Sequence, residues 1–283
     1  MTSGVLPTLA IGEPSVPMSG IWKRSVTAII AVPLFVWAVL AGHAAIFSAI
    51  VILLGAGAAW ELSRMFERAE RATLPRLAVL GAVAVMASFL APGGPTIAMT
   101  AAILVVLTAA LSVATARSVE TAATTMLTVA YVGWPMGHAL LLRGELAGPQ
   151  LVLLLVGVTW AGESAAYLVG STLGRHKLAP TISPGKTVEG AAAQVIVSLG
   201  VAPALGAWLL PDWSVAPLLG AGLLLGVLGQ VGDLAESTIK RSLGTKDTGG
   251  MIPGHGGVLD RLDSLLFNTP ALYYYVTIVG ACS

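Results

Sequence analysis

The sequence predicts an all-α fold, a polytopic transmembrane helical bundle with about nine spans. Hydrophobic residues make up 56% of the 283-residue chain and charged residues only 10%, whereas ordinary soluble domains are roughly 25% charged. Apolar stretches of the roughly 20-residue length that a helix needs to cross a bilayer recur along the chain. A water-soluble fold cannot bury this much apolar surface, so we expect an integral membrane protein.

The apolar stretches define the expected organisation. Residues 1–22 contain no Lys or Arg and are expected to form a flexible tail. N-terminal transmembrane helices are expected over 23–145, and a C-terminal region over 146–283 with two polar cytoplasmic loops, at 171–189 and 236–263. The expected spans are 25–42, 44–61, 77–92, 96–116, 121–142, 149–170, 189–210, 214–235 and 264–282.

Two features of the first spans leave alternatives open. The joint near His43 could instead form a re-entrant hairpin, which makes eight or ten spans the alternatives. Lys23 and Arg24 precede the first apolar run, as in a secretory signal peptide. A second apolar run follows almost at once, which favours an uncleaved span.

The basic residues predict the orientation, because short cytoplasmic loops carry an excess of Lys and Arg. With a cytoplasmic N-terminus, the outside loops hold only Arg143 of the fifteen Lys and Arg residues. The inside segments hold Lys23, Arg24, Arg64, Arg68, Arg71, Arg76, Arg117, Arg175, Lys177, Lys186, Lys240, Arg241, Lys246 and Arg261. We therefore expect a multi-pass protein of the plasma (inner) membrane, with its N-terminus and active site in the cytoplasm.

Composition excludes several classes of site and partner. Cys282 is the only cysteine, so an internal disulfide and a cysteine metal cluster are both excluded. The formal net charge of +1 gives no reason to expect nucleic acid as a partner. Closely spaced glycines, such as Gly222 and Gly226, predict tight helix packing and are also compatible with a homodimer.

Ionisable residues gather at the cytoplasmic end of the span at 214–235. On a continuing helix, Asp233, Glu236, Ser237 and Lys240 share one face. A carboxylate at the membrane edge is costly unless it is paired, hydrated or bound to metal, so Asp233 is a functional candidate. The alternative is an ion pair to Lys240 or Arg241 that only anchors the helix end.

A glycine-rich polar stretch follows and ends at two further carboxylates. Glycines between 249 and 257 would let the backbone approach a phosphate closely, although a plain flexible connection would look the same. Asp260 and Asp263 then lie three residues apart at the start of the last span. Capping of the helix N-terminus is the alternative role for either one.

These residues together suit a site that handles polyphosphate. Mg²⁺ binds one or two carboxylates and keeps its other positions for water and substrate phosphates. Lys240, Arg241, Lys246 and Arg261 could neutralise phosphate charge. The lipid-embedded surroundings indicate that the second substrate is a lipid.

Two motifs resemble those of the phosphatidate cytidylyltransferases, also called CDP-diacylglycerol synthases. The first is Ser237-Thr-Ile-Lys-Arg-Ser-Leu-Gly-Thr-Lys-Asp-Thr-Gly-Gly-Met-Ile-Pro-Gly-His-Gly-Gly-Val-Leu-Asp-Arg-Leu-Asp263. The second is Gly174-Arg-His-Lys-Leu-Ala-Pro-Thr-Ile-Ser-Pro-Gly-Lys-Thr-Val-Glu-Gly190. The motifs lie in the C-terminal half, and the N-terminal helices match only as generic apolar spans.

The resemblance implies a phospholipid-biosynthetic enzyme that joins CTP to phosphatidic acid, with Mg²⁺ as cofactor and a monovalent cation such as K⁺ as a candidate companion. It implies Asp233 and Asp260 as metal ligands, with Asp263 in support, and phosphate-holding roles for Lys240, Arg241 and Arg261. The remaining candidates for binding the nucleotide or the lipid phosphate are Ser183, Gly185, Lys186, Thr187, Ser237, Lys246, Asp247 and His255.

One position departs from the family pattern. The family's Trp-x-x-Asp-x-x-Ala-Tyr pattern is here Trp160-Ala-Gly-Glu163-Ser-Ala-Ala-Tyr167. The additional methylene of Glu163 puts a metal role in doubt, and a packing carboxylate paired with a basic loop residue is the alternative. For the whole chain, the competing predictions are a CTP-dependent lipid kinase and a transporter, although a transporter should carry its charges near the bilayer midplane.

Overall fold

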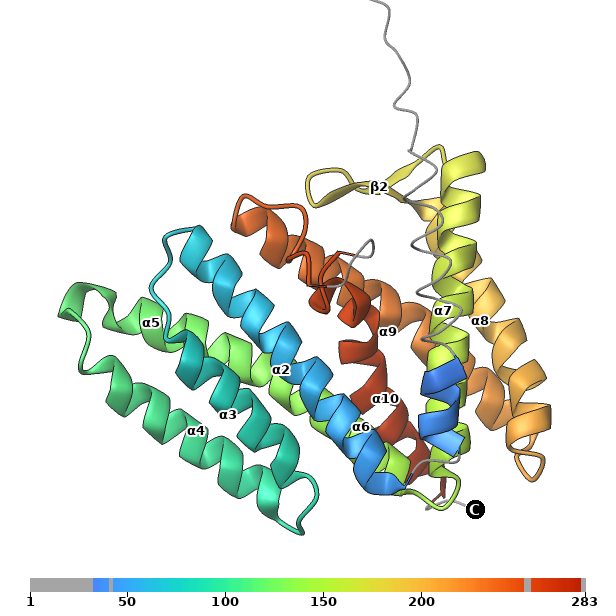
Figure 1. Cartoon of the computed structure of the whole chain (residues 1–283). Coiled ribbons are helices and arrows are strands. Elements are labelled where there is room, and N and C mark those ends of the chain that lie inside the picture. The colour runs from blue at the N-terminus through green and yellow to red at the C-terminus, as the bar shows by residue number, and fades with distance from the viewer. Residues whose placement is uncertain (1–32, 41–42, 252–255, 281–283) are drawn as a thin grey trace, which may run out of the picture.

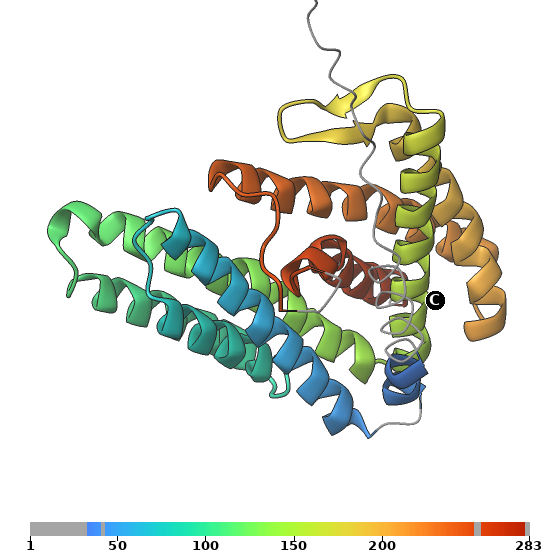
Figure 2. The same ribbon diagram turned by 45° about the horizontal axis from the view of Figure 1, so that its top comes forward.

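A computed structural model describes residues 33–40, 43–251 and 256–280, and these residues are almost entirely helical. Figures 1 and 2 show long helices that lean against one another, with a small hairpin at one end of the bundle. The helices beyond a short helical segment at 33–40 are α2 (Ala44–Arg68), α3 (Pro75–Ser88), α4 (Gly94–Ala110), α5 (Thr115–Thr128), α6 (Trp134–Gly144), α7 (Gly148–Thr172), α8 (Val188–Leu209), α9 (Val215–Ser242) and α10 (Asp263–Gly280).

The helical, membrane-spanning class is confirmed. Within the described residues, five helical stretches are long and apolar enough to cross a membrane, namely α2, Thr115–Gly144, α7, α8 and α9. The stretch Thr115–Gly144 joins α5 to α6 through the π-helical turn η1 (Val129–Gly133). The helices α3 and α4, of 14 and 17 residues, are shorter than the expected spans 77–92 and 96–116, and the count of nine stays a prediction.

Two helices run further than the apolar pattern alone indicated. The helix α2 continues to Arg68, through a segment that mixes charged residues with the buried Leu62, Met65 and Phe66, and α9 continues to Ser242. Neither extension contains Gly or Pro, so the helical hydrogen-bond ladder is not interrupted. The extensions carry Glu236 and Lys240 beyond the expected end of their span.

The stretch predicted as a polar loop at 171–189 forms a β-hairpin. Strand β1 (Lys177–Ala179) pairs antiparallel with β2 (Ser183–Thr187), and Ala179 lies opposite Ser183. Pro180 follows Ala179, and the Ile182 amide donates to the Ala179 carbonyl at 3.2 Å. Proline suits this place in a turn because its φ is already restricted. The all-α prediction therefore needs this one small correction.

The core joins both halves of the chain. The helix α7 packs on α8, α8 on α9 and α9 on α10, while α10 also packs against α6. Close glycine contacts hold α9 in place, as predicted: a Cβ at Gly222 would lie 2.5 Å from the Ser198 carbonyl oxygen of α8, and one at Gly232 would lie 2.6 Å from the Asp263 carbonyl oxygen of α10. Larger residues at these two positions would push α9 away from both neighbours.

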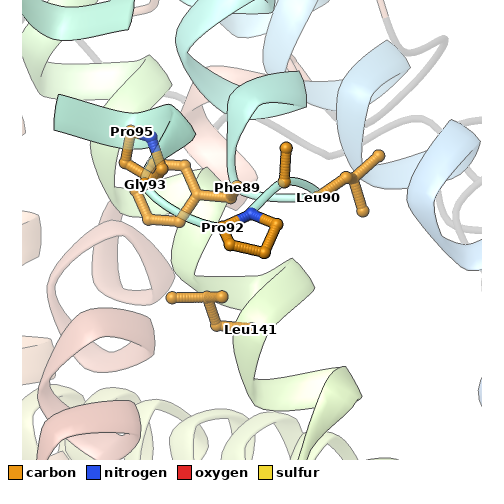
Figure 3. Close-up of a pocket in the computed structure, with 7 residues that line it drawn as sticks. Phe89, Leu90, Pro92, Gly93, Pro95 and Leu141 are labelled. Carbon is orange, nitrogen blue, oxygen red and sulfur yellow. The ribbon is translucent and has the colours of Figure 1, made fainter. Parts of the chain in front are cut away.

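The bundle has two chemically different ends. The hairpin and the C-terminal ends of α2 and α9 lie toward one end, and the turn between α3 and α4 lies toward the other (Figures 1 and 2). A small pocket at that turn is lined by apolar residues that include Phe89, Pro92 and Leu141 (Figure 3). It has no charged lining residue, so it offers nothing to bind a phosphate. The charged residues that the sequence singled out lie at the other end.

Candidate active site

Lys240 is the centre of the charged cluster. Its Nζ lies 2.8 Å from Glu236 Oε1, one turn earlier on α9, and 2.8 Å from Asp260 Oδ1 in the 3-10 turn η2 (Leu259–Arg261). The Lys240 side chain is only 13% exposed and that of Glu236 only 1%. A buried charge is stable only when it is paired and hydrogen-bonded, so this lysine links α9 to the start of the last helix.

Asp260 is held on both of its oxygens. While Oδ1 contacts Lys240, Oδ2 accepts from the Thr248 amide at 3.2 Å, the Thr248 hydroxyl at 2.9 Å and the Gly257 amide at 3.1 Å. Burial by itself would raise the pKa of Asp260, but the hydrogen bonds from Lys240, Thr248 and Gly257 outweigh it and hold the pKa below its usual value. Asp260 is therefore an ionised anchor at neutral pH.

A second ion pair joins the hairpin motif to α9, four residues before the motif that begins at Ser237. Lys186 Nζ, on β2, lies 2.7 Å from Asp233 Oδ2 on α9, and both side chains are partly exposed. The two atoms are close, but their angles do not suit a hydrogen bond, so within the described part of the chain this contact is an ion pair only. Asp233 Oδ1 also accepts from the Ser237 hydroxyl at 3.4 Å. The sequence proposed an anchoring pair between Asp233 and Lys240 or Arg241, but the structure pairs Asp233 with Lys186.

Arg241 positions the hairpin. Its Nε donates to the Ile182 carbonyl at 3.0 Å, and its Nη1 donates to the Thr245 carbonyl at 3.2 Å. The guanidinium thus ties the hairpin turn to the segment that follows α9. In this arrangement Arg241 supports the site through backbone contacts, whereas the sequence proposed that it would hold phosphate.

An acidic group completes the cluster. The charge of Asp263 interacts with those of Asp233 and Glu163, and Glu163 also interacts with Lys186 and Arg261 and accepts a hydrogen bond from the Ser264 side chain. The packing alternative for Glu163, as a partner of a basic loop residue, stays a prediction, because the ion pair of Lys186 is with Asp233. Asp263 Oδ1 accepts from the Ser264 amide at 2.7 Å, in keeping with its alternative role at the helix start.

The remaining predicted residues divide between the hairpin and the α9–α10 connection. Thr187 is the N-cap of α8 and accepts from the Gly190 amide at 3.1 Å, so its hydroxyl has a structural role. Ser183 pairs within the hairpin, and Gly185 faces open space. Lys246 and Asp247 are exposed, and His255 lies outside the described residues.

The donor set bears on the predicted metal site. Among residues 33–40, 43–251 and 256–280, no three side chains of His, Cys, Asp or Glu gather closely enough to hold one metal ion. Mg²⁺ nevertheless needs only one or two carboxylates when substrate phosphates supply the rest. Asp233 and Asp263 lie on adjoining parts of α9 and α10, since a Cβ at the neighbouring Gly232 would lie 2.6 Å from the Asp263 carbonyl oxygen. Asp233 is itself engaged, by Lys186 and by Ser237 at 3.4 Å, but Asp260 is more heavily engaged, with four donor contacts on its two oxygens, and therefore fits Mg²⁺ less well.

Sequence reasoning missed Glu61. This residue of α2 is only 3% exposed, and its Oε2 accepts from the Leu259 amide at 2.9 Å and lies 3.1 Å from the Thr248 hydroxyl oxygen. A signal was present, since Glu61 is a carboxylate at the end of the apolar stretch 44–61, where an ionisable residue is a functional candidate. The N-terminal helices therefore contribute directly to the site.

Comparison with known proteins identifies the family of this chain. The model of the cytidylyltransferase family matches residues 22–279. Similar proteins include the phosphatidate cytidylyltransferase of Staphylococcus aureus strain COL, 42% identical over 151 residues that are 53% of this chain and 57% of that protein. The corresponding protein of Synechocystis is 46% identical over 134 residues, 47% of this chain and 45% of its own length.

The uncharacterized protein YnbB of Escherichia coli K12 is 45% identical over 129 residues, 46% of this chain and 43% of its own length. The chain thus spans about half the length of the curated relatives it matches. The family model, in contrast, extends over nearly the whole chain, from the helices that supply Glu61 to those that supply Asp233 and Asp260. On this match, the chain belongs to the cytidylyltransferase family.

Proposed function

We propose that this protein transfers the cytidylyl group of CTP to phosphatidic acid, forming CDP-diacylglycerol and releasing pyrophosphate. The observation that carries the proposal is the ion pair between Lys186 and Asp233 at 2.7 Å. This ion pair brings the hairpin motif beside the part of α9 that leads into the motif at 237–263. Cations and carboxylates suited to a nucleoside triphosphate therefore lie together at one end of the apolar helices. Relatives named phosphatidate cytidylyltransferase support the choice of substrates.

The proposed reaction is a substitution at phosphorus. A phosphate oxygen of phosphatidic acid attacks the α-phosphorus of CTP, and the bond from that phosphorus to the oxygen bridging the α and β phosphates breaks, with pyrophosphate leaving. Such transfers depend on positioning and charge neutralisation. Lys186 is the cation we assign to a phosphate, because its Nζ is held at the site beside Asp233 and has no hydrogen-bond acceptor among the described residues.

The lysine at the centre of the cluster has a different task. Lys240 already contacts two carboxylates, so its main role is to hold Asp260 at a fixed position beside α9. Asp233 and Asp263 would hold Mg²⁺, which supplies charge neutralisation at the triphosphate when bound. K⁺ remains a candidate companion ion, and Lys246 and Arg261 remain candidates for contact with either substrate.

We also propose a location for the reaction, at the cytoplasmic face of the membrane. The excess of Lys and Arg in the segments at the charged end favours a cytoplasmic active site in the plasma (inner) membrane. CTP would reach the site from the cytoplasm and phosphatidic acid from the bilayer. The proposed homodimer would use glycine-rich helix faces.

Position-specific radiolabelling of CTP tests the reaction class. Purified protein in detergent with phosphatidic acid, Mg²⁺ and CTP labelled at the α-phosphate should yield labelled lipid, while label at the γ-phosphate should appear in pyrophosphate. Label from the γ-phosphate in lipid would instead identify a lipid kinase. Solute flux in vesicles without labelled lipid would identify a transporter.

The Lys186–Asp233 ion pair predicts non-additive losses of activity. Lys186→Met and Asp233→Asn should each lower kcat/KM by about a hundredfold, and the double variant should lose about as much as either single variant, because both changes break one unit. Lipid labelling measures all four rates. The exposed Arg64–Glu67 pair on α2 provides the control, since R64M/E67Q should keep near-normal activity. Losses that multiply would show that the two residues act separately.

Glu163 tests the departure from the family pattern. If the additional methylene displaces the carboxylate beside Asp233 and Lys186, Glu163→Asp should turn over faster than the natural chain, by a factor of about two to five. The measurement is kcat at saturating CTP and phosphatidic acid. Equal rates would show that the site tolerates glutamate, with its hydrogen bond from Ser264 setting its position.

A further inference from the structure

Glu61 connects two parts of the α9–α10 connection that are separate in sequence. Its Oε2 accepts from the Leu259 amide at 2.9 Å and lies 3.1 Å from the Thr248 hydroxyl oxygen. Thr248 and Leu259 are themselves buried, at 1% and 0% exposed. They belong to the described flanks of this connection, Thr248–Met251 and Gly256–Asp260. A single oxygen of α2 therefore holds both flanks.

The same two flanks carry the donors that hold Asp260. Thr248 and Gly257 together give Asp260 Oδ2 its three hydrogen bonds. The Thr248 hydroxyl oxygen lies between Glu61 Oε2 and Asp260 Oδ2, at 3.1 and 2.9 Å, so the two carboxylates share its single proton, and Asp260 in turn contacts Lys240. The position of Glu61 thus decides where the donors to Asp260 lie.

Glycines on both flanks leave room for this carboxylate. A Cβ at Gly249 would lie 2.7 Å from Glu61 Oε1, and a Cβ at Gly257 would lie 2.5 Å from Glu61 Oε2 and would overlap the Thr248 hydroxyl oxygen. No side chain fits at such separations without displacing its neighbours. At these two positions, the close approach that glycine permits is to Glu61 and Thr248, whereas the sequence suggested an approach to phosphate.

Packing alone does not account for Glu61. A buried carboxylate loses much of its hydration, a cost that is offset only by hydrogen bonds or a counter-charge. The nearest basic residue on α2, Arg64, pairs with the surface residue Glu67 at 2.6 Å. The polar contacts of Glu61 are with Thr248 and Leu259, one on each flank. We therefore attribute the burial of this carboxylate to its contacts with the two flanks.

We propose that Glu61 is a positioning residue of the active site, which acts by holding the Thr248–Met251 and Gly256–Asp260 flanks so that Asp260 and Lys240 keep their geometry. Its effect on turnover rests on the proposed function, while its effect on the flanks does not. The length of the side chain matters for this role, because the carboxylate must reach from α2 to the Leu259 amide. The negative charge matters less, since a neutral amide oxygen also accepts hydrogen bonds.

Hydrogen exchange tests the positioning without any assay of activity. In Glu61→Ala, amides of segment 256–262 should exchange about ten to a hundred times faster, because the Leu259 N–H loses its acceptor. Glu61→Asp should resemble the alanine variant because it is too short. Glu61→Gln should remain within about threefold of the natural chain, because its amide oxygen can still accept. The matched control is Glu67→Gln on the exposed face of α2, which should leave segment 256–262 unchanged.

Turnover provides the second readout. Glu61→Ala and Glu61→Asp should lower kcat about tenfold or more with little change in KM for CTP, and Glu61→Gln should restore most of the rate. If the Glu61 variants do not fold, Thr248→Val removes one of the two links and should still accelerate exchange in both flanks.

The outcomes separate this inference from the proposed reaction. Unchanged exchange in Glu61→Ala, or an active Glu61→Asp beside an inactive Glu61→Gln, would overturn the positioning role. Faster exchange in Glu61→Ala and Glu61→Asp but not in Glu61→Gln would support it. That support would hold even if the natural chain made no labelled lipid, a result that would refute only the proposed reaction.

Discussion

Replacing Asp260 with asparagine is expected to lower kcat by at least about a hundredfold while the protein still accumulates in membranes. Asparagine has the shape of aspartate, but its NH₂ group cannot accept a hydrogen bond. Asp260 accepts on both oxygens, from Lys240 on one side and from Thr248 and Gly257 on the other. Whichever way the amide turns, one set of donors faces another donor.

The α-phosphate label in CDP-lipid measures this loss. Size-exclusion chromatography in detergent checks that Asp260→Asn is folded, and Asp212→Asn, in the segment between α8 and α9, is a control away from the charged cluster. Near-normal turnover in Asp260→Asn would remove Asp260 from the site and would also weaken the role assigned to Glu61.

Replacing Lys240 with methionine is expected to have the largest effect on stability, a loss of about 3–5 kcal/mol in the free energy of unfolding. Methionine keeps the apolar stem but removes the charge between Glu236 Oε1 and Asp260 Oδ1, both at 2.8 Å. The Glu236 side chain is 1% exposed, so its charge would be left buried without a counter-charge. Activity should fall with stability, because Asp260 loses its link to α9.

Thermal unfolding in detergent measures this effect, and Lys177→Met, at an exposed position of β1, serves as the control. Adding Glu236→Gln to Lys240→Met should recover part of the stability, since it removes the buried charge. A Lys240→Met protein as stable as the natural chain would show that Glu236 and Asp260 find other partners.

Much of the site was predictable because it follows local rules. The periodicity of a helix places Asp233, Glu236, Ser237 and Lys240 on one face, and the structure shows Lys240 paired with Glu236 and Ser237 beside Asp233. The motif resemblance correctly indicated the family. The motif at 174–190 identifies Lys186 as a candidate, and the ion pair of Lys186 with Asp233 joins the hairpin to α9.

Other parts were not predictable because they depend on partners distant in sequence. The contacts of Arg241 with the backbone carbonyls of Ile182 and Thr245 have no signal in the sequence, and its phosphate-binding role stays a prediction. The hairpin at 177–187 was read as a loop because three- and five-residue strands are too short to give a periodic pattern. The metal ligation of Asp233, Asp260 and Asp263 stays a prediction.

A bundle of apolar helices with most of its basic residues at one end can be inferred from the amino-acid pattern alone, because hydropathy and helical periodicity are local properties of the chain. Which charged side chains contact one another depends on how the helices pack. Glu61 and Leu259 are 198 positions apart, and no pattern within either segment specifies their contact. It arises from the packing of α2 against η2, where a carboxylate removed from water must find the few donors that the fold brings to it.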